Sequence, residues 1–292
     1  MVWILCSKMI KIDNDTLRVV LHEPQDGFYR GTRFDRSGVF DSVRFAGVEL
    51  ADRWFTCYDP FMHDAVCGPA EEFTAIGFDA AAPGETFMKI GVGLLLRPDD
   101  APYDRFRLYE VADEGEWTVE QEADLVVFHQ RLAGCYDYRK EVVLTSPDRM
   151  EIRHSLESLG AHLSGEVYNH NFWTMGRLET APSRLIDFPF RPEGHWRAEY
   201  ESVALTPAGV RFSRPLAEGE SVFMGDLHAA GSDGMPNSMT LREGAFGVEI
   251  SGDVPVLHTV LWANHRIACL EPYVAFGTPC RWTVRYHFIS YI

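Results

Sequence analysis

The feature that most constrains this fold is a two-residue alternation of apolar and polar side chains, which recurs along the chain. In residues 150–157, Met, Ile, His and Leu alternate with Glu, Arg, Ser and Glu, and residues 282–288 follow the same pattern. Successive side chains of a β-strand point to opposite faces, so this pattern indicates strands with one buried face. Two β-branched runs, LVVFHQ (125–130) and EVVLT (141–145), are expected to pair as neighbouring strands.

Helical periodicity is almost absent from the sequence. The best helix candidate is the short segment PAEEFTAIGF (69–78), which its own glycine and the neighbouring prolines weaken. The 24 glycines and 16 prolines are spread throughout, as in proteins with many short strands joined by turns. We therefore expect an all-β protein, a large antiparallel β-sandwich, with residues 1–292 forming a single domain.

The net charge limits the classes of partner. A formal charge of −16 argues against binding to a nucleic-acid backbone and, more weakly, against an anionic membrane surface. It does not exclude a phosphorylated ligand, because one or two local arginines are enough to hold a phosphate. No segment approaches the roughly 20 apolar residues that span a bilayer, and the apolar run at 2–5 is too short for a signal peptide. We expect a cytoplasmic protein.

The six cysteines are scattered, with no C-x-x-C pair and no zinc-ligand spacing between them. In a chain of this size they are expected to be small buried apolar residues in a reducing compartment. The sequence also has no phosphate-binding loop, dinucleotide-binding glycine motif, serine-hydrolase elbow or H-E-x-x-H motif. We therefore expect no cofactor and name no metal-binding residue, and metal binding itself stays open.

The segment EVYNHNFWTM (166–175) contains the first candidate functional residue, His170. In a strand, His170 shares a face with Tyr168 and Phe172, and the neighbouring asparagines and Trp173 share the other face. A histidine aligned with aromatic residues has two interpretations. It is either a core histidine with a satisfied hydrogen bond or a functional group.

The segment HRIACLEPY (265–273) contains the second candidate, Glu271. Glu271 shares a strand face with Ile267 and Cys269, and Pro272 is expected to end the strand. A carboxylate on a buried face needs a partner or a purpose, because an unpaired buried charge is costly. The alternative is a salt bridge at the rim with Arg266 or Arg281.

Taken together, the YNHNFW and CLEPY motifs resemble those of the aldose 1-epimerase (galactose mutarotase) superfamily, and the resemblance covers the chain from about residue 20 to its end. It implies a galactose mutarotase-like β-supersandwich and a cofactor-independent enzyme that interconverts sugar anomers. His170 and Glu271 are then the catalytic acid–base pair, and Asn169 is placed with the substrate-binding residues.

The resemblance also implies substrate contacts elsewhere in the chain. In YRGTRFDRSG (29–38), Arg33 corresponds to a sugar-contacting arginine, with a surface pair between Arg33 and Asp35 as the alternative. Trp262 stacks on a sugar face or packs in the core. The chain departs from the family pattern at one position: many members carry a second histidine, and Cys67 stands at its expected place. Glu72 is the alternative polar group there, and His63 lies close in the sequence.

Three functions stay open at this point: a mutarotase, a non-catalytic sugar-binding or sugar-sensing protein, and a glycoside hydrolase or polysaccharide lyase on a similar scaffold. All three have a small-molecule sugar as the partner. The sequence does not say which sugar binds. A homodimer is compatible with the exposed strand edges that such a fold leaves.

Overall fold

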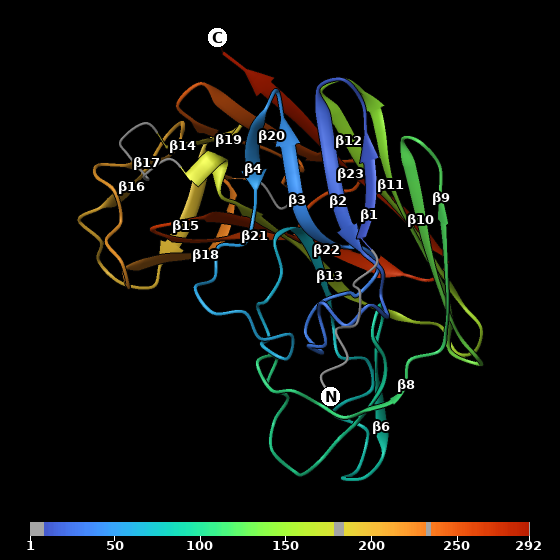
Figure 1. The fold of residues 1–292 in the computed structure, drawn as a ribbon. Coiled ribbons are helices and arrows are strands. Elements are labelled where there is room, and N and C mark those ends of the chain that lie inside the picture. The colour runs from blue at the N-terminus through green and yellow to red at the C-terminus, as the bar shows by residue number, and fades with distance from the viewer. Residues whose placement is uncertain (1–8, 178–183, 232–234, 292) are drawn as a thin grey trace.

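The computed structural model describes residues 9–177, 184–231 and 235–291. Within these ranges the chain is almost entirely β-strand, and the single helical element is the three-residue 3₁₀ helix η1 (Met175–Arg177). The predicted all-β class and antiparallel sandwich are confirmed (Figure 1). Among the described residues, no helix is long and apolar enough to cross a membrane.

Two sheets form the body of the molecule, and in Figure 1 the strands of one run across the view while those of the other stand more upright. The ten-stranded sheet contains, in spatial order, β16 (Val203–Thr206), β17 (Gly209–Phe212), β14 (Leu185–Asp187), β19 (Ser238–Glu243), β20 (Phe246–Gly252), β23 (Cys280–Ser290), β12 (Arg149–Ser158), β11 (Tyr136–Ser146), β10 (Leu125–Leu132) and β9 (Glu116–Gln121). The six-stranded sheet contains β15 (Pro192–Trp196), β18 (Ser221–Ala229), β21 (His258–Asn264), β22 (Ala268–Gly277), β13 (Ser164–Trp173) and β5 (Gly68–Phe73).

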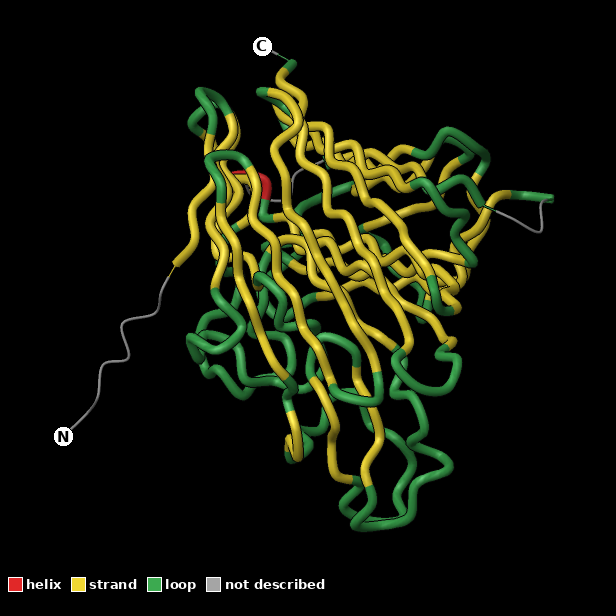
Figure 2. The backbone as a smooth tube through the Cα atoms, turned by 90° about the vertical axis from the view of Figure 1, so that its right-hand side faces the viewer, coloured by secondary structure: helices red, strands yellow, loops and turns green. Residues whose placement is uncertain are grey.

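Two smaller sheets complete the fold. One contains β1 (Met9–Asp13), β2 (Leu17–His22), β3 (Val39–Phe45) and β4 (Val48–Ala51), and the other contains β6 (Thr86–Lys89), β7 (Gly93–Leu96) and β8 (Val111–Asp113). The long strands lie side by side in Figure 2, and many of the loops gather towards the lower end of the molecule. The main hydrophobic core includes side chains from the four-, six- and ten-stranded sheets.

The strands follow the alternation seen in the sequence. On β12, Met150, Ile152, His154 and Leu156 are buried, whereas the residues that alternate with them are exposed or half-buried. The predicted pairing of the two β-branched runs is confirmed, because β10 pairs with β11 over eight positions, from Leu125–Val143 to Leu132–Tyr136. Period-two burial therefore sets which side chains each strand contributes to the core.

The predicted helix at 69–78 is wrong, because Gly68–Phe73 is strand β5 and pairs with β13. The reason is long-range. As a strand, the segment directs Glu71 and Glu72 to opposite faces, and each finds buried cationic partners there. A helix would not separate two adjacent carboxylates in this way.

Glu71 faces the ten-stranded sheet, where it joins a buried charged network. Lys140 Nζ of β11 donates to Glu71 Oε2 at 2.5 Å and lies 3.5 Å from Asp35 Oδ2, and His154 Nε2 is 3.2 Å from Glu71 Oε1. Burial opposes the charge on Lys140, but the carboxylates of Glu71 and Asp35 outweigh it and raise its pKa above the ordinary value. This network joins β5 to the opposite sheet.

The network leads to a stability prediction. Lys140→Met keeps the aliphatic bulk but leaves two buried carboxylates without their shared cation, so we expect it to lower the free energy of unfolding by about 3–5 kcal/mol. Arg139→Met, at the adjacent and largely exposed position, should stay within about 1 kcal/mol. Urea denaturation of both variants measures the difference. Equal stabilities for the two would contradict a stabilising role of Lys140.

Candidate functional site

A cavity of about 670 Å³ lies against the face of the six-stranded sheet that points away from the main core. This volume falls in the usual range for small-molecule sites. Its floor is formed by residues of β13, β21 and β22, and the segments around residues 63 and 102–106 cover its sides. The polar and aromatic residues that line it include Arg33, His63, Arg105, His170, Trp262, Glu271 and Tyr273.

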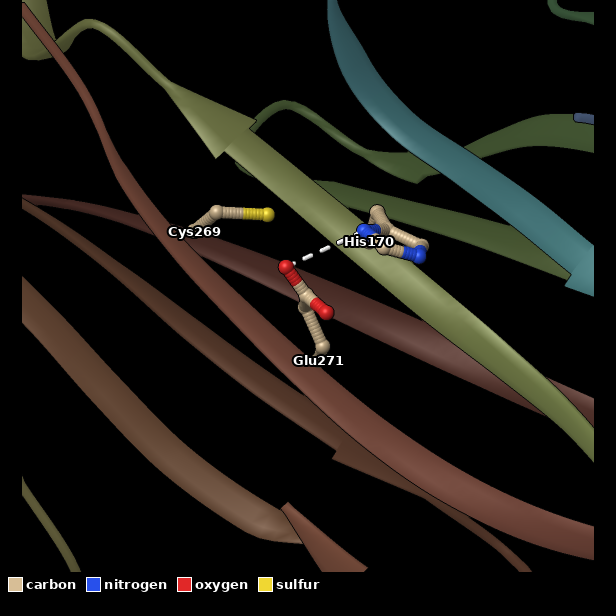
Figure 3. A group of neighbouring side chains, drawn as sticks. All are labelled: His170, Cys269 and Glu271. Atoms are coloured by element: carbon tan, nitrogen blue, oxygen red, sulfur yellow. Dashed lines mark ion pairs between the residues drawn. The ribbon is translucent and has the colours of Figure 1, made fainter. Parts of the chain in front are cut away.

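His170 and Glu271 face each other across the floor of this cavity. The pairs Tyr168–Tyr273 and Phe172–Cys269 fix the register of β13 against β22, and this register puts His170 directly opposite Glu271. His170 Nδ1 lies 3.1 Å from Glu271 Oε1 (Figure 3). The structure thus brings the two predicted catalytic residues together, although 100 residues separate them in the chain.

Glu271 lies inside its strand, and the expectation that Pro272 ends the run is wrong. Proline lacks an N–H, but the ladder is repaired locally because Asn171 Nδ2 donates to the carbonyls of Asn169 and Leu270. The strand continues to Gly277. The alternative salt bridge to Arg266 or Arg281 is also wrong, since the partner of Glu271 is His170.

His170 is not a core histidine with a satisfied hydrogen bond. Its side chain is 1% exposed, yet neither ring nitrogen has a hydrogen-bond partner within the described ranges. Both nitrogens instead lie at ion-pair distance from carboxylates, Nε2 being 3.4 Å from Glu72 Oε2. The edge-on ring of Phe34, at 4.9 Å between centroids, and the stacked ring of Phe172, at 5.6 Å, hold the imidazole between them.

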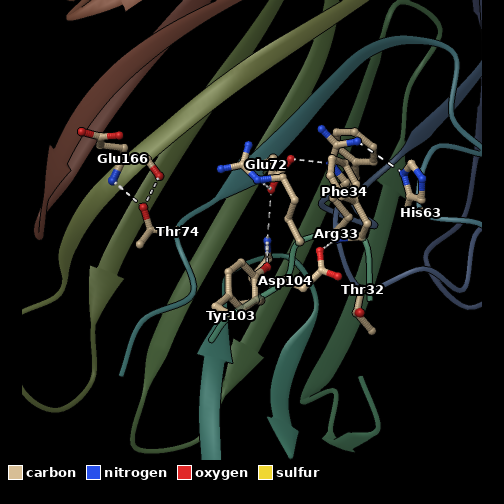
Figure 4. A network of polar contacts seen from close by, with 12 residues as sticks. Thr32, Arg33, Phe34, His63, Glu72, Thr74, Tyr103, Asp104 and Glu166 are labelled. Carbon is tan, nitrogen blue, oxygen red and sulfur yellow. Dashed lines mark hydrogen bonds and ion pairs between the residues drawn. The ribbon is translucent and has the colours of Figure 1, made fainter. Parts of the chain in front are cut away.

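Arg33 is linked to His170 through Glu72, which lies between the two side chains. Arg33 Nε donates to Glu72 Oε2 at 2.6 Å, and Nη1 lies 3.5 Å from His63 Nδ1 (Figure 4). The alternative pair of Arg33 with Asp35 is therefore wrong, because Asp35 is buried in the Lys140 network on the other side of the sheet. Arg33 also lies over the ring of Phe34, with its guanidinium carbon 4.6 Å from the ring centroid.

Glu72 is buried directly behind His170 and is held as a carboxylate by nearby positive charges. Burial alone would raise its pKa, but contact with His170 and the charges of Lys89 and Arg33 keep the pKa well below its usual range. Lys89 Nζ is 4.0 Å from Glu72 Oε1, and Arg105 Nε is 3.7 Å from it. Burial lowers the pKa of Lys89 to about 8, although Glu72 acts in the opposite direction.

The remaining predicted site residues fall into two groups. Trp262 of β21 is half-buried and lines the cavity, 5.4 Å from Trp54 between ring centroids. Asn169 does not face the cavity. Its side chain lies on the core face of β13, where Nδ2 donates to Glu71 at 3.1 Å and Oδ1 accepts from Tyr286 at 2.7 Å.

Cys67 is fully buried and forms an isolated antiparallel β-bridge, through its backbone, with Phe40 of β3. It is not one of the residues that line the cavity. The nearby histidine that does line the cavity is His63, within reach of Arg33. Cys67 therefore does not occupy the place of a second histidine in the cavity.

Several charged residues of the site are not among those predicted from the sequence. Lys89 is buried and lies in the apolar segment FMKIG. A single charged residue within an apolar segment is the sequence signal that could have identified it. Arg105 follows the loop at 98–104 and lies over Tyr168, 5.1 Å from its ring centroid. Arg197 lines the cavity 3.8 Å from the ring centroid of Phe223. No sequence pattern marks either arginine, because both reach the cavity from loops.

The chain was compared with protein-family models, with curated proteins and with solved structures. No family model and no curated protein matches the chain. Several solved structures match the chain. A galactose mutarotase related enzyme from Lactobacillus acidophilus is 12% identical with a TM-score of 0.57, and the match covers 97% of this chain and 97% of the other. An aldose epimerase homologue from C. elegans is 12% identical with a TM-score of 0.58, covering 98% of this chain and 99% of the other. The Slr1438 protein from Synechocystis sp. PCC 6803 is 11% identical with a TM-score of 0.58, covering 97% and 96%.

These matches show that the chain has the galactose mutarotase-like β-sandwich fold over nearly its whole length. The predicted resemblance is confirmed at the level of the fold. At 11–12% identity the likeness is one of fold.

Opposite pKa shifts are predicted for two buried lysines, Lys89 beside Glu72 of the site and Lys140 in the core network. With lysine side chains labelled for NMR, Lys89 should titrate near pH 8 and Lys140 above the ordinary range, which exposed lysines define. Glu72→Gln removes the charge that stabilises the Lys89 ammonium, so we expect the pKa of Lys89 to fall further in that variant. An ordinary pKa for Lys89 would contradict its burial behind the site.

Proposed function

We propose that this protein is an aldose 1-epimerase-type isomerase that interconverts the α and β anomers of a sugar without a cofactor. The single observation that carries the proposal is the His170–Glu271 pair, 3.1 Å apart on the floor of a cavity lined by aromatic and polar residues. Anomer exchange needs one group that removes a proton and one that supplies it. A carboxylate and an imidazole at adjacent strand positions provide both.

In the proposed reaction, the anomeric hydroxyl and the ring oxygen of the sugar insert at the pair and separate the two side chains. Glu271 removes the proton of the anomeric hydroxyl, and His170 donates a proton to the ring oxygen as the bond between that oxygen and C1 breaks. Rotation about the C1–C2 bond exposes the other face of the aldehyde. Ring closure with the proton transfers reversed then gives the other anomer and restores both residues.

The surrounding residues support this division of roles. Glu72 lies at the Nε2 side of His170, so its carboxylate stabilises the doubly protonated ring that the proposed step needs: one proton stays on Nε2 towards Glu72, and the proton on Nδ1, which faces Glu271 and the cavity, is the one donated. Arg33 and Lys89 balance the charge of Glu72. Trp262 offers a flat apolar face, and Arg33, His63 and Arg105 offer hydrogen-bond donors for sugar hydroxyls.

Glycoside hydrolysis has less support from the geometry. That chemistry needs two carboxyl groups facing the scissile bond. Asp64 and Asp104 also line the cavity, but the second carboxylate next to His170 is Glu72, which is 2% exposed and already ion-paired with Arg33. Binding without catalysis stays the main competing function, and a measurement of anomer exchange distinguishes it from the proposed isomerase.

The test is anomer exchange by NMR or polarimetry over a panel of neutral, phosphorylated and uronic sugars. The wild-type protein should accelerate exchange of at least one of them. Glu271→Gln should lower kcat by at least about 100-fold, because it removes one proton-transfer group, and should leave sugar affinity within a few-fold. Tryptophan fluorescence is suited to measuring that affinity, since Trp262 lines the cavity.

The matched control is Glu166→Gln, the same substitution at an exposed position of β13 outside the cavity, which should leave exchange unchanged. If some sugar binds but no sugar exchanges faster than in buffer, the protein is a sugar-binding protein and the isomerase proposal fails.

The cytoplasmic location, the absence of a nucleic-acid or membrane partner and the homodimer stay predictions.

A further inference from the structure

A third side chain with a metal-binding atom lies beside the proposed acid–base pair. Cys269 precedes Glu271 by two residues on β22, so both project from the same face of the strand (Figure 3). One ligand atom each from His170, Cys269 and Glu271 lie within 4.8 Å of one another, and all three residues are buried. We call these residues the three-donor group.

We propose that the three-donor group binds a thiophilic divalent cation such as Zn²⁺, through His170 Nδ1, Cys269 Sγ and one oxygen of Glu271. Nitrogen, sulfur and carboxylate oxygen are the donors that zinc uses in proteins. Three protein ligands leave a fourth tetrahedral position, which here opens to the cavity. This is the arrangement of zinc sites that keep an exchangeable ligand.

The distances suit a small contraction around the ion. Zinc bonds of about 2.0–2.3 Å place tetrahedral ligand atoms roughly 3.3–3.8 Å apart. The His170 and Glu271 atoms are already 3.1 Å apart, and no pair in the group exceeds 4.8 Å. His170 Nδ1 is also buried without a hydrogen-bond partner among the residues described, so no hydrogen bond to that nitrogen has to break.

Neighbouring residues provide the outer contacts that zinc sites need. Glu72 lies 3.4 Å from His170 Nε2, the carboxylate–histidine arrangement that fixes the tautomer for metal binding at the other nitrogen. The backbone N–H of Asn171 is directed at the sulfur of Cys269 and favours its thiolate. Two of the three donors, His170 and Cys269, therefore already have a neighbouring group that orients them for metal binding.

The charges and protons balance on binding. Cys269 can bind a metal only as its thiolate, so its thiol proton has to leave. Zinc displaces that proton to solvent, and the resulting thiolate and the Glu271 carboxylate together cancel the two charges of the ion. A neutral complex meets the requirement of a buried site better than an uncompensated cation does.

Bound zinc would occupy both members of the acid–base pair. This part of the inference rests on the proposed function, and it predicts that micromolar zinc reversibly inhibits anomer exchange and that a chelator restores it. The site would then couple the activity of the enzyme to available zinc. Spacing along the chain gave no sign of this, because the donors come from two different strands.

The experiment uses Co²⁺ as a spectroscopic substitute for zinc on the full chain. Titration of the wild-type protein should produce a sulfur-to-cobalt charge-transfer band and the intense visible bands of tetrahedral cobalt, both removed by added Zn²⁺. Zinc should also raise the Tm of the wild-type protein, because it binds only the folded state. Cys269→Ser should lose the charge-transfer band and weaken zinc binding by at least about tenfold.

The matched control is Cys67→Ser, the same substitution at an equally buried cysteine outside the group, which should keep the band and the affinity. The inference is overturned if wild-type protein gives no charge-transfer band, or if Cys269→Ser binds zinc as tightly as wild type. Circular dichroism of both variants shows whether they are folded. The cobalt band and the Tm shift do not depend on turnover, so this test gives its answer even if no sugar is exchanged.

Discussion

The pairing of β13 with β22 on one side and β5 on the other is the constraint on which the site depends. The register of these three strands puts His170 opposite Glu271 and brings Glu72 to the same face. On the other face, the same strands direct Asn169 and Glu71 into the buried network with Lys140. A shift of one residue would exchange the two sets and destroy both.

Buried charge is present on both faces of this sheet, and each face neutralises it separately. Towards the core, Lys140 is shared by Glu71 and Asp35. Towards the cavity, Glu72 is surrounded by Arg33 and Lys89 and keeps its charge beside His170. The first arrangement joins two sheets, and the second orients an imidazole, so one adjacent pair of glutamates contributes to both stability and chemistry.

The sequence predicted the parts of the fold that follow from local alternation. It identified β10, β11, β12 and β23 and assigned Tyr168, His170 and Phe172 to one face of a strand. It failed at residues 69–78 and at Pro272, where contacts between distant strands outweigh local preference. At Pro272 the deciding contact is the side-chain amide of Asn171, which no pattern of single residues reveals.

For the candidate site, the sequence by itself determined the two main residues, His170 and Glu271, and the kind of strand that presents each. Only the tertiary structure decided their partners: Glu72 behind His170, Cys269 beside Glu271, and the arginines that reach the cavity from loops. The physical reason is that alternation sets the direction of a side chain within its own strand. The strand or loop it meets is set by pairing register and loop path, which depend on the packing of the whole chain.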